Sequence, residues 1–102
     1  WRDIFTKIRK IYGGRLTYAA NWGHEFENVS FWEALDAIGL NCYYPLSNNP
    51  GANDGELLKG AQAVARKIGE IAAKHNKPVI ITEIGFASRP ANWLEPHRDG
   101  DG

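Results

Sequence analysis

The stretch Pro78-Val79-Ile80-Ile81-Thr82-Glu83 decides the fold of this chain. Four consecutive β-branched side chains predict a β-strand. The run is too uniformly apolar for a sheet that has one face in water, and strands of this kind belong to parallel sheets covered on both faces. We therefore expect an α/β fold built on a parallel sheet.

Helical and strand patterns alternate through the residues that precede this strand. Apolar residues at spacings of three and four predict a helix over residues 4–12, which two glycines end, and a long helix over residues 54–76. Short apolar runs predict strands over residues 16–22 and 40–44, and the second strand must end at Pro45, which has no N–H for the ladder.

Capping residues refine these boundaries. Ser30 and Glu33 have the spacing of a capping box, which predicts a short helix that runs to about Ile38. Asp54 is the expected N-cap of the long helix. Asn76 suits the left-handed turn that ends this helix.

The resulting order α-β-α-β-α-β is typical of parallel βα units. A (β/α)8 (TIM) barrel uses about 250 residues for eight units, so a chain of 102 residues holds about three of them. We expect a partial (β/α)8 TIM barrel, in which residues 1–102 are a fragment from the C-terminal half of one domain, incomplete at both ends. Uncovered strand edges and helix faces in such a piece favour self-association.

Composition excludes several classes of function. Twelve basic residues balance twelve acidic ones, so the chain lacks the positive charge of a nucleic-acid-binding protein. No apolar run approaches the length of a membrane span. The single cysteine, Cys42, excludes an internal disulfide and a Cys-x-x-Cys metal site, and we expect its thiol to be buried and inert. We expect no cofactor, no metal, and neither nucleic acid nor a membrane as a partner.

Polar and aromatic residues collect where the predicted strands end, which is where parallel α/β folds bind their ligands. They are Asn21, Trp22, Tyr43, Tyr44 and Glu83. Burying a lone carboxylate is costly, so Glu83 requires either partners or a function. It is therefore either a catalytic residue or a structural acid that pairs with a Lys or Arg at the barrel rim.

Strand alternation suggests a partner for this carboxylate. If Glu83 points into the barrel, Ile81 and Val79 should point there too, because successive side chains alternate between faces. Tyr43 lies on the neighbouring strand, so its hydroxyl is expected to donate to Glu83 and to hold the carboxylate ionised and oriented, as a nucleophile requires. Packing in the core or at the rim is the alternative for both Tyr43 and Tyr44.

The two candidate tryptophans each have two interpretations, whereas the remaining polar segments have one. Trp22 and Trp93 are either flat platforms for sugar rings or packing residues. The group of His24, Glu25 and Glu27 is expected to be a solvated loop. The sequence Asp99-Gly100-Asp101 is too short for a calcium loop.

Four segments together resemble the clan A glycoside hydrolases, and most closely the β-mannanase-type glycoside hydrolase family 113. These segments are residues 16–22 (LTYAANW), 31–39 (FWEALDAIG), 41–46 (NCYYPL) and 77–85 (KPVIITEIG). The resemblance extends over nearly the whole chain, from the helix after strand four to the loop after strand seven. Its most specific part is the strand end Thr82-Glu83-Ile84-Gly85.

This resemblance implies a retaining mechanism with Glu83 as the nucleophile. It implies that the strand-six tyrosine hydrogen-bonds the nucleophile, a role for Tyr43 with Tyr44 as the alternate. It places the acid/base Glu after an Asn at the end of strand four, and no Asn-Glu pair occurs in these 102 residues. Asn21, Trp22, Tyr44 and Trp93 are the expected substrate contacts.

The sequence therefore indicates part of a retaining glycoside hydrolase that cleaves a β-linked polysaccharide or oligosaccharide such as β-mannan. Without the acid/base residue, the isolated fragment should be inactive. Two other classes remain open. One is a catalytically silent, carbohydrate-binding relative, and the other is a structural βα piece of an unrelated barrel or Rossmann-like protein, although no Gly-x-Gly-x-x-Gly turn follows the first strand.

Overall fold

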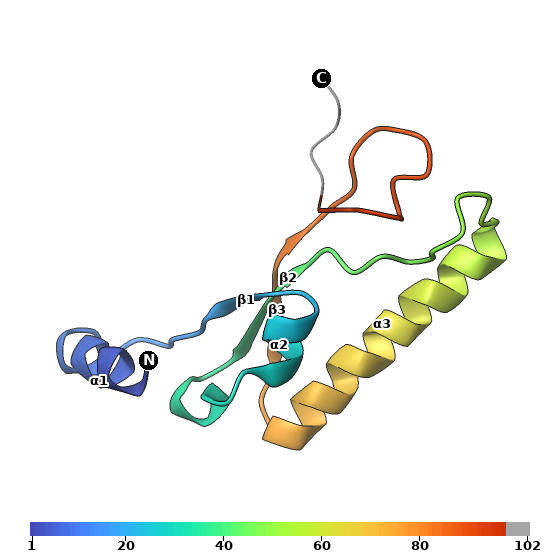
Figure 1. The fold of residues 1–102 in the computed structure, drawn as a ribbon. Coiled ribbons are helices and arrows are strands. Elements are labelled where there is room, and N and C mark those ends of the chain that lie inside the picture. The colour runs from blue at the N-terminus through green and yellow to red at the C-terminus, as the bar shows by residue number, and fades with distance from the viewer. Residues whose placement is uncertain (98–102) are drawn as a thin grey trace.

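The computed structural model describes residues 1–97 as a three-stranded parallel sheet with helices beside it (Figure 1). The sheet order is β1-β2-β3, the order of the strands in the chain. This confirms the expected α/β fold and fits three βα units of a barrel. The sequence Asp99-Gly100-Asp101 lies outside the described residues. The elements are α1 (Arg2–Ile11), β1 (Ala19–Asn21), α2 (His24–Asn28), the 3-10 helix η1 (Trp32–Ala34), β2 (Ile38–Cys42), α3 (Asp54–His75) and β3 (Val79–Ile84).

One face of the sheet forms the core. Ile38, Leu40 and Cys42 of β2 are buried. Because strand residues alternate between faces, these three side chains share one face. The partly buried side chains Val64, Ile68 and Ile71 of α3 pack against that core, and Figure 1 shows α3 running alongside the sheet.

The opposite face is open in the part of the chain that the structure describes. Ala19 and Asn21 of β1 are exposed on this face, and Ile80 of β3 is 49% exposed. The molecule is correspondingly elongated, with extents of 51 × 33 × 20 Å. In a closed barrel this face would line the interior, which side chains from all eight strands fill.

The long helix α3 agrees closely with its sequence signals. Asn76 follows it in the left-handed conformation, with φ of 50°, which confirms the expected end. The N-cap is Asn53 rather than Asp54, because the Asn53 side chain accepts a 2.9 Å hydrogen bond from the Glu56 backbone N–H. Within residues 1–97 no helix combines the length and apolarity needed to cross a bilayer.

The short helix expected to run from Ser30 to Ile38 does not form. Only the single turn η1 forms, its N-cap is Phe31, and no side chain caps it. The competing interaction lies at Asp36, whose backbone N–H donates to the Leu16 carbonyl at 2.9 Å. This long-range bond holds residues 35–37 as a bent, non-helical connection into β2, so the capping box was a wrong signal here.

The segment expected to be a solvated loop is the helix α2. Phe26 in its centre is 1% exposed and packs against Trp32, with ring centroids 6.5 Å apart. Gly23 caps the helix with φ of 83°, a conformation that favours glycine. The charged residues on either side of Phe26 made its burial hard to recognise in the sequence. Its buried ring holds the short helix against the core.

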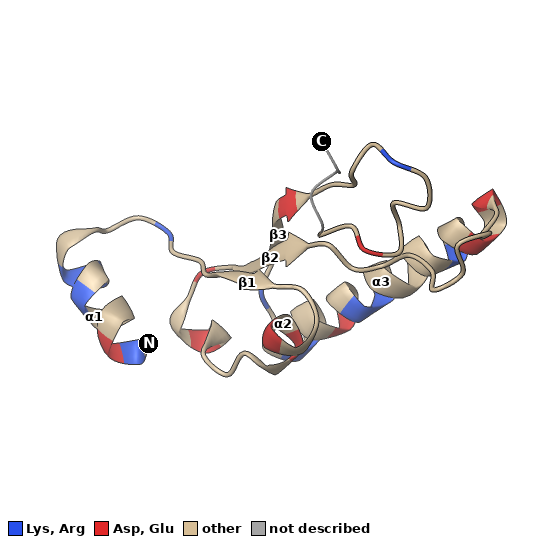
Figure 2. Ribbon diagram, turned by 45° about the horizontal axis from the view of Figure 1, so that its top comes forward, with Lys and Arg blue, Asp and Glu red and all other residues tan. Residues whose placement is uncertain are grey.

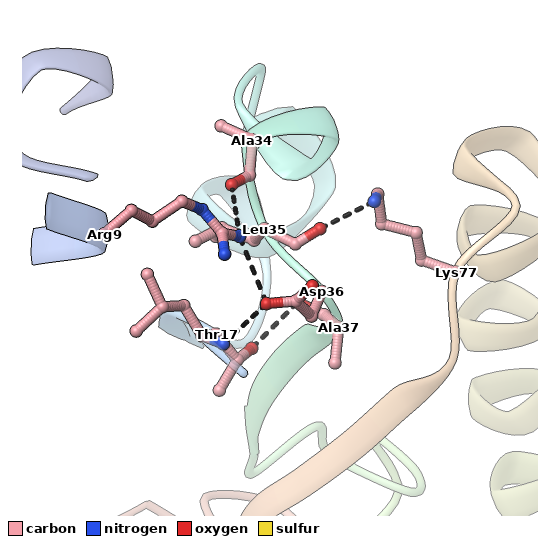
Figure 3. Close-up of polar contacts among 8 residues, drawn as sticks. Arg9, Thr17, Ala34, Leu35, Asp36, Ala37 and Lys77 are labelled. Atoms are coloured by element: carbon pink, nitrogen blue, oxygen red, sulfur yellow. Dashed lines mark hydrogen bonds and ion pairs between the residues drawn. The ribbon is translucent and has the colours of Figure 1, made fainter. Parts of the chain in front are cut away.

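Polar side chains join the loops that precede the three strands (Figure 3). We call this set of contacts the N-terminal clamp; its side chains are Arg9, Thr17, Asp36 and Lys77. The Asp36 carboxylate accepts from the Leu16 backbone N–H at 2.7 Å and from Arg9 at 3.1 Å. Thr17 donates to the Ala37 carbonyl at 2.9 Å, Lys77 donates to the Leu35 carbonyl at 2.6 Å, and Arg9 donates to the Ala34 carbonyl at 3.0 Å.

Candidate active site

A register irregularity in β3 determines which face Glu83 occupies. Leu40 of β2 pairs with Ile81, but the next residue, Asn41, pairs with Glu83, so Thr82 and Glu83 both lie opposite Asn41. Such a β-bulge adds one residue to a strand and re-aims the side chains that follow it. Figure 2 shows the acid of β3, coloured red, at the end of this strand.

The bulge overturns one expectation from strand alternation. Ile81 and Ile84 both line an apolar cavity of about 220 Å³ beside α3, and Val79 packs against the core on that side. Glu83 instead pairs with Asn41, whose neighbours Leu40 and Cys42 face α3. Glu83 therefore shares the open face with Asn41, while Ile81 and Val79 occupy the other one.

A short chain of hydrogen bonds crosses this open face. The Thr82 hydroxyl donates to Asn41 Oδ1 at 2.6 Å. Asn41 Nδ2 in turn donates to Asn21 Oδ1 at 3.3 Å. One residue from each strand takes part, so the carboxyl ends of β1, β2 and β3 are joined beside Glu83. The sequence indicated Asn21, but it did not single out Asn41 or Thr82 for this contact.

The Glu83 carboxylate itself has no hydrogen bond or ion pair within residues 1–97. It is exposed at the open carboxyl edge of the sheet. No Lys or Arg of the described chain pairs with it, as a structural rim acid would require. Both oxygens are thus available to groups from outside these residues.

Tyr43 follows β2 directly and is half-buried. It lies two residues beyond Asn41, the strand partner of Glu83, so it is a diagonal neighbour of the carboxylate on the same face. Within the described residues no hydrogen bond joins its hydroxyl to Glu83. The Tyr43–Glu83 bond therefore stays a prediction.

Tyr44 points to the opposite side of the sheet and is only 8% exposed. Its ring meets Trp22 edge-on at 5.6 Å, and the Lys67 ammonium lies 5.1 Å from its centroid. Burial raises the pKa of Tyr44 to about 12, and the carboxylate of Glu27 adds to this effect. These contacts favour the packing alternative for Tyr44.

The two candidate tryptophans are both partly buried. Trp22 is at the carboxyl end of β1, where its backbone N–H donates to the Asn41 carbonyl at 3.1 Å. Trp93 lies in the loop after β3, and its indole Nε1 donates to the Asn49 carbonyl at 3.1 Å. The Trp93 carbonyl accepts from the Leu46 N–H at 3.1 Å. Trp93 thus ties together the two loops that follow β2 and β3.

Glu25 is a contact that the sequence did not reveal. Its carboxylate accepts from the Tyr18 hydroxyl at 2.8 Å and from the Asn21 backbone N–H at 3.3 Å. The hydrogen bond to Glu25 raises the pKa of Tyr18. Glu27 of the same helix pairs with Lys67 at 3.0 Å. Within residues 1–97 no group of three or more His, Cys, Asp or Glu side chains is arranged to hold a metal ion.

The carboxyl edge of the parallel sheet thus carries the Glu83 carboxylate, which the bulge directs to the open face, beside a row of polar side chains. The sequence also matches a family model, that of glycoside hydrolase family 113, over residues 1–98. The chain belongs to glycoside hydrolase family 113. No individual curated protein matches it. Membership of family 113 identifies a glycoside hydrolase of the mannanase type, whose substrate is a carbohydrate.

Proposed function

We propose that Glu83 is the catalytic nucleophile of a retaining family 113 enzyme that cleaves β-linked polysaccharides or oligosaccharides such as β-mannan. The observation that carries this proposal is the bulge opposite Asn41, because it turns the only acid of β3 to the open face. The carboxyl end of the strands is where TIM barrels build their active sites. An exposed carboxylate without partners suits attack on a bound sugar.

The proposed reaction has two steps. In the first, a Glu83 oxygen forms a bond to the anomeric carbon, the glycosidic C–O bond breaks, and a carboxylic acid from another segment protonates the leaving oxygen. In the second, water attacks the anomeric carbon, the Glu83–sugar bond breaks, and the same outside carboxylate takes the water proton. The two carboxyl groups of such a pair are about 5–5.5 Å apart.

Other side chains at this edge take supporting roles in the proposal. The Tyr43 hydroxyl donates to Glu83 when the site is complete, which keeps the carboxylate ionised and correctly aimed. Asn21, Trp22 and Trp93 contact the substrate, since amide groups bind sugar hydroxyls and indole rings pack against sugar faces. Tyr44, which lies on the α3 side, supports Trp22 from behind through their edge-on contact.

We further propose that residues 1–102 supply strands five to seven of the barrel, and that the acid/base lies on strand four of the parent. Three observations support this arrangement: the three strands run parallel, β3 has a free edge, and the face opposite α3 is open. An isolated chain then lacks half of the carboxyl pair and should be inactive. Its exposed Ile80, Ile84 and Phe86 favour self-association.

The test is Glu83→Ala in the full-length parent enzyme, assayed on an aryl β-glycoside with an activated leaving group. Turnover should fall by about 10⁴-fold or more, since no covalent intermediate can form. Azide, a small anion that fits the vacated space, should partly restore turnover and give a glycosyl azide of inverted configuration. Glu70→Ala, which removes an exposed carboxylate of α3, is the matched control and should retain the parent rate.

Ordinary turnover in Glu83→Ala would remove Glu83 from the nucleophile role. A parent without measurable turnover, but with retained sugar binding, would favour the carbohydrate-binding relative instead. The isolated chain of residues 1–102 should show no turnover of the same aryl glycoside. A parent-like rate from that chain would contradict the proposed division of the carboxyl pair.

A further inference from the structure

The direction in which the Glu83 side chain points depends on one extra residue in β3. In a strand of regular alternation, Ile81 and Glu83 would lie on the same face. Ile81 lines the apolar cavity beside α3 together with Val64 and Ile68. A Glu83 carboxylate on that side would meet apolar side chains, at a large desolvation cost. The bulge avoids this desolvation cost, because it directs the carboxylate to the open face.

The hydroxyl of Thr82 is the side-chain group that holds the bulged pair of residues. Thr82 and Glu83 lie opposite Asn41, and the Thr82 hydroxyl donates to Asn41 Oδ1 at 2.6 Å. The Asn41 amide is held in turn, because its Nδ2 donates to Asn21 Oδ1 at 3.3 Å. The extra residue is thus tied by a side chain to β2 and, through Asn41, to β1.

We infer that Thr82 is a positioning residue, which through Asn41 fixes the bulge and with it the direction of Glu83. This inference rests on the proposed nucleophile role of Glu83. Thr82 itself touches no reacting atom. The hydroxyl acts on the reaction only by narrowing the range of positions that the neighbouring carboxylate adopts. Reaction rates are sensitive to such positions, since a misplacement of about 1 Å can cost about 100-fold in rate.

The experiment compares Thr82→Val with Thr82→Ser in the full-length parent. Valine keeps the β-branched shape and removes the hydroxyl, whereas serine keeps the hydroxyl. We expect Thr82→Val to lower kcat by about 10- to 100-fold with little change in KM, because the substrate contacts stay in place. Thr82→Ser should restore most of the lost kcat. Rates are expressed per folded molecule, with the folded fraction measured by circular dichroism.

Thr17→Val is the matched control, because it removes a threonine hydroxyl that donates a hydrogen bond of similar length at the other end of the sheet. Thr17 donates to the Ala37 carbonyl at 2.9 Å, in the N-terminal clamp. This variant should lower the melting temperature and leave kcat per folded molecule unchanged. An equal loss of kcat in Thr17→Val and Thr82→Val would overturn the inference, since both losses would then reflect general stability.

Asn41→Ala gives a second route should Thr82→Val fold poorly. It removes the acceptor of the same bond, so kcat should fall by a similar factor, and the double variant should lose little more than either single one. Fully additive losses would contradict a shared action on Glu83. Glu83→Ala is assayed in parallel: a parent-like rate there refutes the proposed nucleophile, whereas an inactive Glu83→Ala beside a fully active Thr82→Val refutes the positioning role alone.

Discussion

The two ends of the parallel sheet differ in how their polar groups are used. At the amino end, the N-terminal clamp joins all three strand entrances, and the Asp36 carboxylate accepts two hydrogen bonds of 2.7 and 3.1 Å. At the carboxyl end, the Glu83 carboxylate accepts none from residues 1–97. The same chemical group is therefore engaged by its own chain at one end and left available at the other.

This difference separates stability from chemistry along a single sheet. In barrels of this kind, residues at the amino face support the fold, and residues at the carboxyl face act on the substrate. Substitutions at the two ends should then have different signatures. Changes at the amino end should lower stability and spare turnover, whereas changes at the carboxyl end should lower turnover and spare stability.

Tyr43→Phe in the full-length parent tests the carboxyl end, and it has the largest effect of the following predictions. Loss of a hydrogen bond to a charged group costs about 1.5–3 kcal/mol, so kcat should fall by about 10- to 100-fold. The melting temperature should change little, because Glu83 is exposed at the carboxyl edge and the rest of the fold does not depend on this bond. Steady-state kinetics and thermal melting measure the two effects.

Tyr12→Phe is the control for Tyr43→Phe, because Tyr12 is 52% exposed at the end of α1. It should match the parent in both kcat and melting temperature. A Tyr43→Phe enzyme with the parent kcat would show that the Glu83 carboxylate is oriented without this hydroxyl.

Asp36→Ala tests the amino end. It removes the acceptor for the Leu16 N–H and for Arg9, so the free energy of unfolding should fall while kcat per folded molecule stays within about twofold, the usual outcome for sites distant from the chemistry. Asp36→Asn keeps an acceptor oxygen for the Leu16 N–H and should lose less stability. A large loss of kcat in folded Asp36→Ala would contradict the division between the two ends.

Acid titration sharpens the same contrast. The hydrogen bond from the Leu16 N–H, followed by that from Arg9, holds the pKa of Asp36 below its ordinary value. A group with a lowered folded-state pKa stabilises the fold above its unfolded pKa of about 3.9, and this contribution is lost as pH falls through the folded pKa. The free energy of unfolding, measured with urea, should therefore fall more steeply below about pH 4 in the parent than in Asp36→Asn.

The smallest expected effect concerns the buried side of the carboxyl end. Burial raises the pKa of Tyr44 to about 12, above the value of about 10 for an unfolded chain. Its contribution is then fully present below pH 10 and is lost as the pH rises toward 12. Stability measured across this range should fall more in the parent than in Tyr44→Phe. Equal slopes would show that Tyr44 ionises as readily when folded as when unfolded.

The sequence predicted the parts of the fold that local chemistry determines. The left-handed Asn76 and the β-branched run before Glu83 placed the end of α3 and the strand β3. Failures occurred where a distant partner decides the local structure. Two hydrogen bonds between Asp36 and Leu16 replace the expected short helix with a bent connection, and the burial of Phe26 holds a charged segment against the core.

The candidate site shows the same limit. Glu83 was identified from its place at a strand end, and its open face agrees with that interpretation. The reasoning by alternation failed because a bulge has no signature in a single strand. It arises between Thr82 and Asn41, which are far apart in the sequence.

Trapping the covalent intermediate would identify the nucleophile itself and so decide the role of Glu83. The full-length parent is treated with a 2-deoxy-2-fluoro β-glycoside that has an activated leaving group, so that the first step outpaces the second. The protein is then digested, and its peptides are sequenced by mass spectrometry. We expect one sugar attached to Glu83, in the peptide that contains Thr82-Glu83-Ile84. Attachment to any other carboxylate, with Glu83 unmodified, would contradict this expectation.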